Sequence, residues 1–359
     1  MSDEGEVPGE DGRDSGVSAE HSQNSVASPA ELDAIEAFWA WWRARSDEFA
    51  ETVNDGRSGE LGALVSMYVD SLGAGLSWEM GPGKASQHHL ALSSAGNPEL
   101  RVLTERWLSR APKPDEHWEY YAAKQRSPGL PIGVGIGGLR ISFDEMRLGL
   151  TEDQTRQRVD LKAFHPQLFE LDEKSRGIAL YVFLDHLLGE DGVERWLGLV
   201  EMVEEEPGEA LDPAAAREAL DGFAASATSE KWSILEVKFE GPGRHLLTAN
   251  LGLKRVDHLL FDVHYSIALT YPCRRPDGMP DKHVNEELWE ADDALAKLLG
   301  PYAVKVAHET KQGVRTIHLH APASGAVLSR IEEWAEAYPQ WSPEVSANHD
   351  PGWKWFLSW

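Results

Sequence analysis

The sequence predicts an α+β protein of two domains, and three observations lead to this prediction. The chain has 359 residues, which is more than one hydrophobic core usually organises. Its apolar fraction of 42%, with 14 tryptophans, is sufficient to fill such cores. From Trp232 onward the predicted elements follow a regular order, whereas the earlier half mixes helices and strands less regularly. The predicted division is an acidic tail (1–29), an α+β domain (30–204), an acidic linker with a short helix (205–230) and a C-terminal domain (231–359).

Residues 1–29 are rich in Gly, Ser and acidic side chains, which predicts a disordered tail. Order is expected to begin at Ser28, a helix cap followed by Pro29 in the first turn and Glu31 in the third position. In the helix that follows, large apolar residues recur at helical spacing. A core-packing face is favoured over a membrane-surface helix, because the neighbouring charges are mostly acidic. The apolar residues are Phe38, Trp41, Trp42, Phe49 and Val53.

The rest of the N-terminal domain is predicted to mix helices and strands in an α+β arrangement of ordinary size. Helices are expected at 60–71, 97–108 and 175–189, and strands at 76–80, 88–93, 117–125, 158–165 and 193–204. The linker contains the acidic run Glu204–Glu206 and a short helix, which Asp212 caps and Pro213 begins.

The C-terminal domain shows the clearest pattern. A leading pair of strands is expected at 232–241 and 245–253. After it come a strand (258–271), a helix (285–300), a hairpin (302–310 and 314–320), a helix (324–339) and a strand (341–347). This β-α-β-β-α-β order predicts a ferredoxin-like fold with an added N-terminal hairpin, and its crossovers put both helices on one face of the sheet.

Three stretches of this domain resemble the bacterial domain of unknown function 695. They are RRPDGMPDKHVNEELWEADDALAKLL, QGVRTIHLH and the ending HDPGWKWF. That family looks like a relative of the regulator of ribonuclease E activity B, a small acidic inhibitor protein with a ferredoxin-like fold. In the other half, LDHLLGEDGVERWLGLVE looks like a region found in bacterial proteins. Neither resemblance implies catalytic residues.

Charge and cysteine content narrow the class of protein. With 34 basic and 60 acidic residues, the net charge of -26 repels phosphate, so no direct nucleic-acid binding is expected. An acidic surface suits solubility, or attraction to a basic protein partner. The single cysteine fits a reducing compartment. The N-terminus lacks signal-peptide features, and no run of about 18 apolar residues exists, so we expect a cytoplasmic protein without membrane association.

A literal GxGxxG occurs at Gly133, Gly135 and Gly138. A dinucleotide fingerprint needs a strand before these glycines and a helix directly after them. Here Pro131 precedes them, and LRISF, which is typical of a short strand, follows. We therefore expect a tight hairpin or a loop, and no cofactor.

Several histidines are candidate metal ligands. His318 and His320 lie two residues apart on a predicted strand, so both imidazoles point to one face. A zinc site would need a third ligand, and no sequence spacing ties one to this pair. The candidates are His88, His89, His258, Asp262 and His264. Partly exposed structural histidines are the favoured interpretation, and no metal is expected.

No catalytic residue is predicted elsewhere. Asp185 and His186 are neighbours on a helix and point about 100° apart, so they cannot pair directly. Cys273 has two adjacent arginines that would lower its thiol pKa, but no positioned base is identifiable.

The C-terminus carries a candidate partner-binding site. Trp353 and Trp355 alternate, and we expect them, with Asp350, to form a protein-binding patch or else to pack in the core. Together with the charge, this favours a non-enzymatic binding protein, a regulator of the inhibitor or immunity type, acting on a basic protein partner. The alternatives are a metal-dependent enzyme with a dispersed His/Asp site and a structural or assembly protein.

Overall fold

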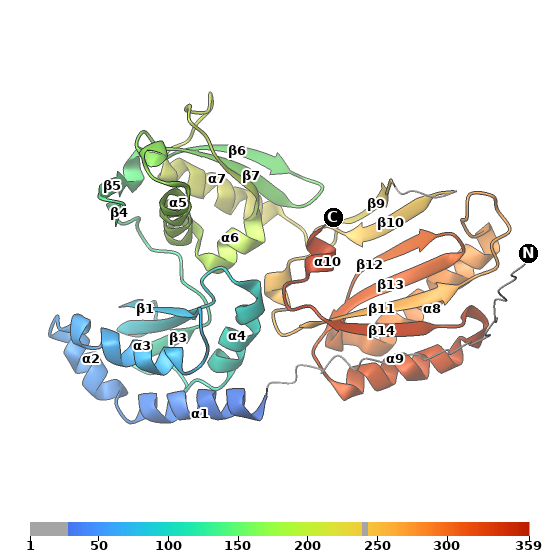
Figure 1. The fold of residues 1–359 in the computed structure, drawn as a ribbon, viewed down its shortest axis with the longest axis horizontal. Helices are drawn as coiled ribbons and strands as arrows, with labels where there is room; N and C mark the ends of the chain where they lie inside the picture. Colours follow the sequence, from blue (N-terminus) through green and yellow to red (C-terminus); the bar gives the residue numbers. More distant parts are fainter. Residues whose placement is uncertain (1–27, 239–242, 359) are drawn as a thin grey trace, which may run out of the picture.

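The computed structural model describes residues 28–238 and 243–358, and its helices and sheets make it an α+β protein, as predicted. The predicted tail, 1–29, lies outside the described residues except at Ser28 and Pro29. Figure 1 shows three parts: a first part (28–123), a second part (124–230) and a C-terminal part (from residue 231). Among the described residues, no helix combines the length and apolarity that are needed to cross a membrane.

The first part packs helices against a three-stranded sheet with the order β1-β2-β3. Its elements are α1 (Pro29–Arg43), α2 (Ser46–Asn54), α3 (Gly62–Asp70), β1 (Ser77–Pro82), β2 (His88–Ser93), α4 (Arg101–Ser109) and β3 (Trp118–Tyr121). The Ser28 hydroxyl accepts a hydrogen bond from the Glu31 amide, so the predicted cap is present. The helix expected after it is divided in two, because the backbone leaves helical geometry at Arg45.

Tryptophans form the centre of this core. Trp39, Trp42, Trp107 and Trp118 are fully buried. The indole N–H of Trp39 donates to the Trp107 carbonyl at 2.8 Å, and that of Trp42 donates to the Tyr120 hydroxyl at 3.0 Å. The Trp118 indole donates to the Ser46 carbonyl at 2.8 Å, whereas the Trp107 indole N–H has no hydrogen-bond partner within the described residues. The aromatic face of α1 is therefore a core face.

The second part contains the three-stranded sheet β6-β7-β8 and a separate hairpin, β4-β5. Its elements are β4 (Gly133–Ile136), β5 (Leu139–Ser142), β6 (Arg147–Asp153), β7 (Arg158–Phe164), α5 (Glu173–Leu188), α6 (Glu190–Trp196), β8 (Leu197–Met202) and α7 (Pro213–Ser226). The strand predicted over 193–204 begins only at Leu197, and α6 precedes it.

The helix expected in the 205–230 linker is α7, which is longer than predicted. It buries Ala216, Leu220 and Phe223 in the core of the second part. Asp212 caps it, accepting the Ala215 amide at 2.8 Å. This stretch is consequently packed against the second part and does not lead away from it.

The first two parts share one arrangement of strands. In each, an antiparallel hairpin is followed by a helical crossover and a third strand that lies parallel to the second. In the first part the crossover contains α4, and in the second it contains α5 and α6. The helices α4 and α5 therefore hold equivalent positions in the two parts. They carry Arg101 and Asp185, which line the groove described below.

The C-terminal part has a six-stranded sheet in the order β14-β11-β13-β12-β10-β9, with neighbouring strands antiparallel. Its elements are β9 (Trp232–Glu236), β10 (His245–Asn250), β11 (Val263–Thr270), α8 (Lys282–Leu299), β12 (Val304–Lys311), β13 (Val314–Ala321), α9 (Gly325–Ala337), β14 (Glu344–His349) and α10 (Lys354–Leu357). The strands and the helices α8 and α9 appear in the predicted order, and α10, which was not predicted, follows them. The helices α8 and α9 pack their apolar residues against one face of the sheet.

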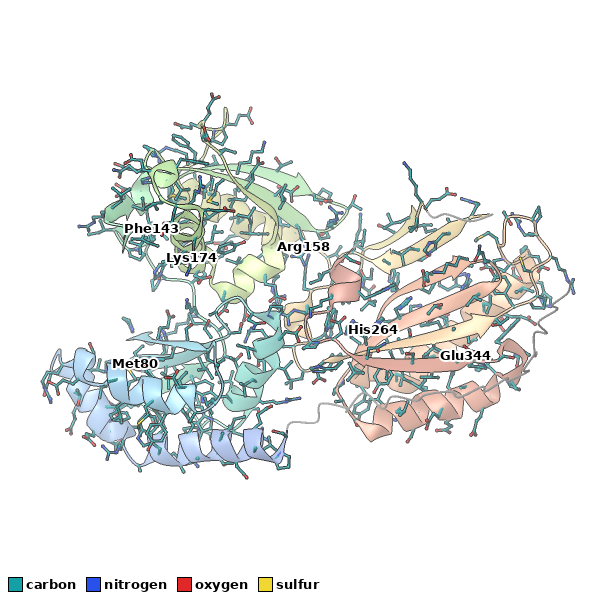
Figure 2. All side chains as sticks on the ribbon, viewed as in Figure 1. Met80, Phe143, Arg158, Lys174, His264 and Glu344 are labelled. Carbon is teal, nitrogen blue, oxygen red and sulfur yellow. The ribbon has the colours of Figure 1, made fainter. Side chains whose placement is uncertain are left out.

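Polar contacts join the three parts. Arg106 of α4 forms an ion pair with Asp262 of the C-terminal part at 3.1 Å. The Lys254 ammonium donates to the Gln157 carbonyl at 2.7 Å. Arg158 and His264, labelled in Figure 2, come from the second and C-terminal parts and lie toward the middle of the molecule. The region between the parts is therefore rich in charged groups.

Candidate functional site

A groove with a volume of about 1340 Å³ is lined by residues of all three parts. One wall is formed by α5, through Lys174, Gly177, Ile178, Tyr181, Val182 and Asp185. The first part contributes Pro98 and Arg101, and the C-terminal part contributes Arg255, Gly352 and Leu357. We call this feature the α5 groove.

The helix α5 exposes an apolar stripe to the groove. Its core face buries six residues, and its outward face is also apolar. Ile178 is 45% exposed and Tyr181 is 53% exposed. Ile178 lies four positions before Val182, and Tyr181 lies four positions before Asp185, so these side chains form one continuous stripe. A helix that is apolar on its outer face as well as its inner face usually has something to cover it.

Two cations of the groove are already paired. Arg101 forms ion pairs with Asp191 and, at 3.2 Å, with Glu105. Arg255 donates to both carboxylate oxygens of Glu194, and its Nε lies 2.7 Å from one of them. These guanidinium groups are consequently neutralised within the protein.

Three lining carboxylates lack such compensation. Asp172, Glu173 and Glu190 line the groove, and no ion pair joins them to a cationic side chain of the described residues. Asp172 accepts a backbone amide at the start of α5, and Glu190 accepts the backbone amides of Gly96 and Lys124. Lys174 offsets one of these charges. The groove therefore favours a cationic ligand.

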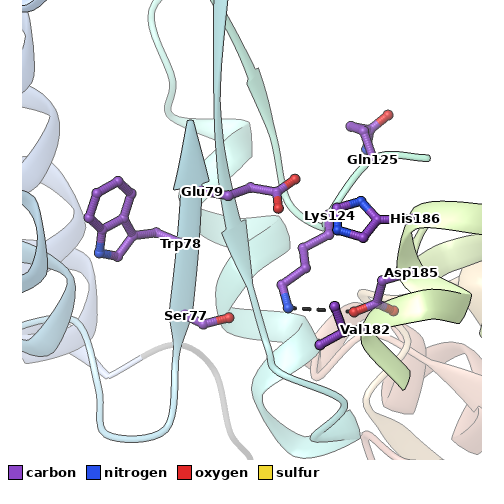
Figure 3. Close-up of a pocket in the computed structure, with 8 residues that line it drawn as sticks. All are labelled: Ser77, Trp78, Glu79, Lys124, Gln125, Val182, Asp185 and His186. Carbon is purple, nitrogen blue, oxygen red and sulfur yellow. Dashed lines mark hydrogen bonds and ion pairs between the residues drawn. The ribbon is translucent and has the colours of Figure 1, made fainter. Parts of the chain in front are cut away.

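A smaller cavity of about 280 Å³ shares Lys124, Val182 and Asp185 with the α5 groove. Figure 3 shows Glu79 of β1, Lys124, and Asp185 and His186 of α5 around the space between β1 and α5. Charged groups from two parts of the chain thus meet at this inner end.

The Asp185 carboxylate lies 3.5 Å from the Lys124 ammonium, the long end of an ion pair. Burial raises the pKa of Asp185 to about 6, and Glu190 adds to this rise while Lys124 opposes it. A carboxyl with such a pKa exchanges its proton close to neutral pH. Perturbed groups of this kind are concentrated at functional sites.

His186 makes a different contact from its sequence neighbour. Its Nδ1 lies 2.8 Å from the Ser127 hydroxyl, and burial lowers its pKa. Asp185 is engaged with Lys124, so the two adjacent residues serve separate partners, as the helical geometry predicts. The arrangement can hold a charged ligand.

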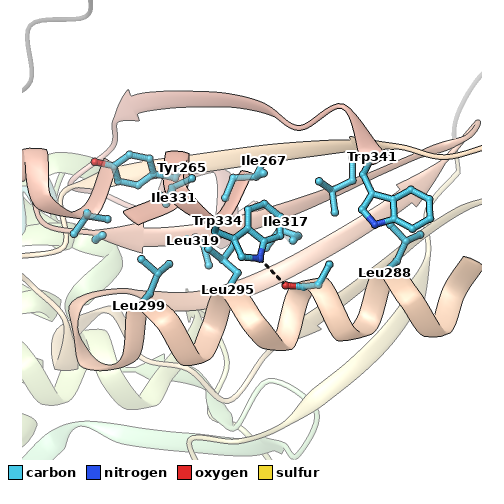
Figure 4. Close-up of a cluster of buried hydrophobic side chains, with 14 of the residues drawn as sticks. Tyr265, Ile267, Leu288, Leu295, Leu299, Ile317, Leu319, Ile331, Trp334 and Trp341 are labelled. Atoms are coloured by element: carbon cyan, nitrogen blue, oxygen red, sulfur yellow. Dashed lines mark hydrogen bonds between the residues drawn. The ribbon is translucent and has the colours of Figure 1, made fainter. Parts of the chain in front are cut away.

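The sequence-predicted histidines His318 and His320 do share one face of β13, opposite to α8 and α9. The helical face of the sheet is the apolar core of Figure 4, where the Trp334 indole donates to the Ala291 carbonyl. On the other face, β11 contributes His264, which pairs in register with His320. The expectation of partly exposed histidines is wrong, since His318 is 3% exposed and His320 is fully buried.

These histidines do not converge on a metal. The His264 Nε2 lies 3.0 Å from the His318 Nδ1, so one ring donates a hydrogen bond to the other. Within residues 28–238 and 243–358, no group of three or more His, Cys, Asp or Glu side chains could hold a metal ion.

The other proposed ligands have separate roles. His88 and His89 lie on β2, in the sheet of the first part. His258 stacks on Trp353, and Asp262 accepts the Ala323 amide while pairing with Arg106. Cys273, which was considered as a nucleophile and not as a ligand, is exposed, and its thiol donates to the Arg275 carbonyl. His88 and His89 thus lie on a different sheet from His318 and His320.

The predicted partner-binding residues form a cover over the histidines. Trp355 stacks on His318 with ring centroids 3.6 Å apart, and Trp353 stacks on His320 at 4.2 Å. Trp353 is fully buried, so it is a core residue and cannot belong to an exposed patch. Asp350 accepts the Lys354 amide at 2.8 Å and so caps α10.

The GxGxxG segment forms the tight hairpin that the sequence predicts. Gly133 and Gly135 lie on β4, and Gly138 lies in the turn that leads to β5. The α5 groove itself was not predicted. The signal in the sequence was the stretch from Ile178 to Leu188, whose apolar residues, interrupted only by Asp185 and His186, occupy every side of a helix. Which of these residues are exposed can be told only once the core face of the helix is known.

Comparison with known proteins agrees with the motifs of the C-terminal part. No curated protein and no solved structure matches the chain significantly. Residues 231–359 match the model of a family of unknown function, DUF695, so the resemblance inferred from the C-terminal motifs of the sequence is confirmed for this part of the chain.

Proposed function

We propose that this protein is a non-enzymatic binding protein that holds a basic, partly apolar segment of a protein partner in the α5 groove. The observation that carries the proposal is the exposed stripe of α5, with Ile178 and Tyr181 open to a groove of protein-ligand size. Tyrosine is enriched among the residues that contribute most to protein–protein binding.

The charge of the groove selects the partner. Asp172, Glu173 and Glu190 form no ion pair with a described cation, and Lys174 offsets only one of their charges, whereas Arg101 and Arg255 are each paired with a carboxylate. The net charge of -26 adds a long-range attraction for basic proteins. An anionic partner would meet repulsion both at a distance and in the groove.

Binding without chemistry suits a regulator of the inhibitor or immunity type. We further propose a cytoplasmic location, a boundary between two domains near residues 205–230, and a ferredoxin-like fold for residues 231–359. The strand order β14-β11-β13-β12, with α8 and α9 on one face, supports that fold.

The test is a binding titration of the full chain with a fluorescent peptide of alternating Lys and Leu. Replacing Tyr181 by Glu puts a charge into the apolar stripe and should weaken binding by about 30-fold or more. High salt should weaken binding of the unmodified protein as well, because part of the attraction is electrostatic.

The matched control is Leu199→Glu, which introduces the same charge at a 66% exposed apolar position outside the groove. Its affinity for the peptide should equal that of the unmodified protein. If Tyr181→Glu left the affinity as unchanged as Leu199→Glu does, the peptide would be binding to the acidic surface in general, and the groove would then not be the site.

A further inference from the structure

The C-terminal segment, residues 350–358, forms one side of the α5 groove through Gly352 and Leu357. The same segment covers the sheet face that is opposite to α8 and α9. Trp353 and Trp355 lie on this face, packed on the histidines of β13. A single short segment therefore connects the histidine-bearing sheet to the groove.

Ring stacking is not the only contact that holds the segment, because Trp353 and Phe356 are also buried in a small apolar cluster with residues of β10 and β12. The Trp353 indole donates to the Phe261 carbonyl at 2.8 Å, and Arg255 donates to the Pro351 carbonyl at 3.0 Å. The exposed Lys354 forms an ion pair with Glu99 of the first part at 2.6 Å. Ion pairs of this exposed kind contribute little to stability.

The stacked histidines are arranged for their neutral forms. One ring of the His264–His318 pair must present a lone pair to the N–H of the other, so the pair cannot take up two protons and keep its contact. His320 is fully buried under Trp353. The Phe261 carbonyl beside His320 acts to raise the pKa of His320, but this carbonyl also accepts the Trp353 indole N–H.

We propose that residues 350–358 are a latch that closes one side of the α5 groove while His264, His318 and His320 are neutral, and that the latch is released when these histidines are protonated. The functional meaning of release, an opened groove, rests on the proposed function, whereas the movement of the latch does not.

Some charged groups near the cluster favour protonation. The Glu309 carboxylate of β12 lies 3.7 Å from the His318 Nε2, but it also lies 2.6 Å from the His245 Nε2 of β10 and 3.5 Å from the Lys311 ammonium. Just before the start of β11, Asp262 is paired with Arg106. These carboxylates can compensate one histidinium at most.

Other groups oppose protonation. Arg255 acts against a charge on His320, and Lys311 acts against one on His318. In the latch itself, Asp350 is used to cap α10, and Lys354 adds a positive charge. His258 also stacks on Trp353. A cation–π contact with a tryptophan returns less free energy than the burial of an unpaired charge costs.

The size of the effect follows from the His264 ring. Burial and the neighbouring His318 lower the pKa of His264 to about 4, against an ordinary value of 6.5. Burial also lowers the pKa of His318 and of His320. If release restores an ordinary pKa, His264 alone shifts the closed-to-open ratio by about 30-fold toward open at pH 5, relative to alkaline pH.

A nitroxide spin label on the latch tests the proposal in the full chain. Cys273→Ser removes the single cysteine, and Ser358→Cys provides an exposed attachment point. The electron paramagnetic resonance spectrum should report an immobile label at pH 7.5 and a growing mobile component as the pH falls toward 5. A label that stays immobile at pH 5 would overturn the proposal.

Two controls separate release from other changes. The same label at Ser329→Cys, on the exposed side of α9, should not change with pH, which excludes general unfolding. A variant with His264→Phe, His318→Phe and His320→Phe keeps flat rings under the tryptophans and should stay closed at pH 5. Replacing the exposed His283 by Gln should leave the release intact. Release in the triple variant would rule out these histidines.

The two proposals fail in distinguishable ways. Without a functional groove, the spin label would still be released by acid while the Lys/Leu peptide fails to bind at neutral pH. Without a latch, the peptide would bind at neutral pH and the label would stay immobile at every pH that preserves the fold. The Tyr181→Glu variant should release its label normally.

Discussion

At the scale of single residues, Asp185 shows a buried charge that is kept at a cost to folding stability. Its carboxylate is taken out of water between β1 and α5, and the Lys124 ammonium at 3.5 Å compensates it incompletely. The pKa of about 6 records this cost, because the folded protein prefers the protonated form more than the unfolded chain does. A group that served packing alone would not need a charge there.

Replacing Asp185 by Asn should therefore stabilise the protein at pH 8. The unfolded carboxyl has its pKa near 3.8, so the group favours the folded state below that pH and loses this contribution as the pH rises through about 6. The free energy of unfolding, from urea titrations, should rise by at most about 3 kcal/mol at pH 8 and hardly change at pH 4. The exposed Asp293→Asn is the control, and an equal gain from it would contradict this account.

The sequence alone does not identify the residues that contact a site residue. Asp185 and His186 were identifiable as candidates, but Lys124 and Ser127, which contact them, lie about 60 positions earlier and carry no motif. For the C-terminal tryptophans, the sequence pattern predicted the wrong backbone conformation. Their alternation predicted a shared strand face, whereas Trp353 adopts a left-handed backbone conformation (φ 51°) and α10 follows it.

At the scale of elements, the β4–β5 hairpin explains the glycine motif without a nucleotide. Ile136 pairs with Leu139, which leaves Gly137 and Gly138 as a two-residue turn. Both have positive φ, 57° and 80°, as the favoured hairpin turns require. The motif glycines thus serve different purposes, since Gly135 sits in a strand with ordinary geometry.

Gly138→Ala and Gly135→Ala should consequently differ in sign. No atom lies within 4 Å of an added Cβ at either position, so crowding plays no part. At Gly138 the left-handed backbone should cost about 1 kcal/mol, whereas at Gly135 alanine should be neutral or stabilise by about 0.5 kcal/mol. Thermal unfolding of both variants measures the difference. Equal losses would show that the turn geometry does not decide the role of these glycines.

Elements were predictable where alternation and caps were strong. The strands and helices of the C-terminal part follow the predicted order, because polar and apolar residues alternate and turns such as Gln312-Gly313 mark the ends. The prediction over 193–204 was wrong in its first turn, where Val193 and Trp196 have the spacing of a helix as well as apolar character. Short apolar runs do not distinguish the two structures.

At the scale of the whole molecule, charged side chains rather than a shared apolar core dominate the described contacts between the second and C-terminal parts. Arg195 pairs with Asp257 at 2.6 Å, and Arg255 pairs with Glu194. Lys254 is buried, and burial with the neighbouring Arg158 and Arg195 lowers its pKa to about 7. Polar contacts of this kind hold a groove in shape while leaving its apolar stripe uncovered.

Arg255 is the contact on which this arrangement depends most. It is 3% exposed, and it joins Glu194 of α6 to the Pro351 carbonyl of the latch. Arg255→Met keeps most of the buried volume but leaves a half-buried carboxylate without its cation, which should lower the free energy of unfolding by about 3 kcal/mol. Because the lost contact lies between two parts, we expect the C-terminal part to unfold in a separate, earlier step in urea.

The matched control is Arg126→Met, whose pair with Asp221 at 2.7 Å is exposed and lies within the second part. This control should cost less than about 1 kcal/mol and keep the shape of the transition. If the two variants lose the same stability in a single transition, the parts are held together by contacts other than Arg255, and the position of the groove wall is independent of this guanidinium.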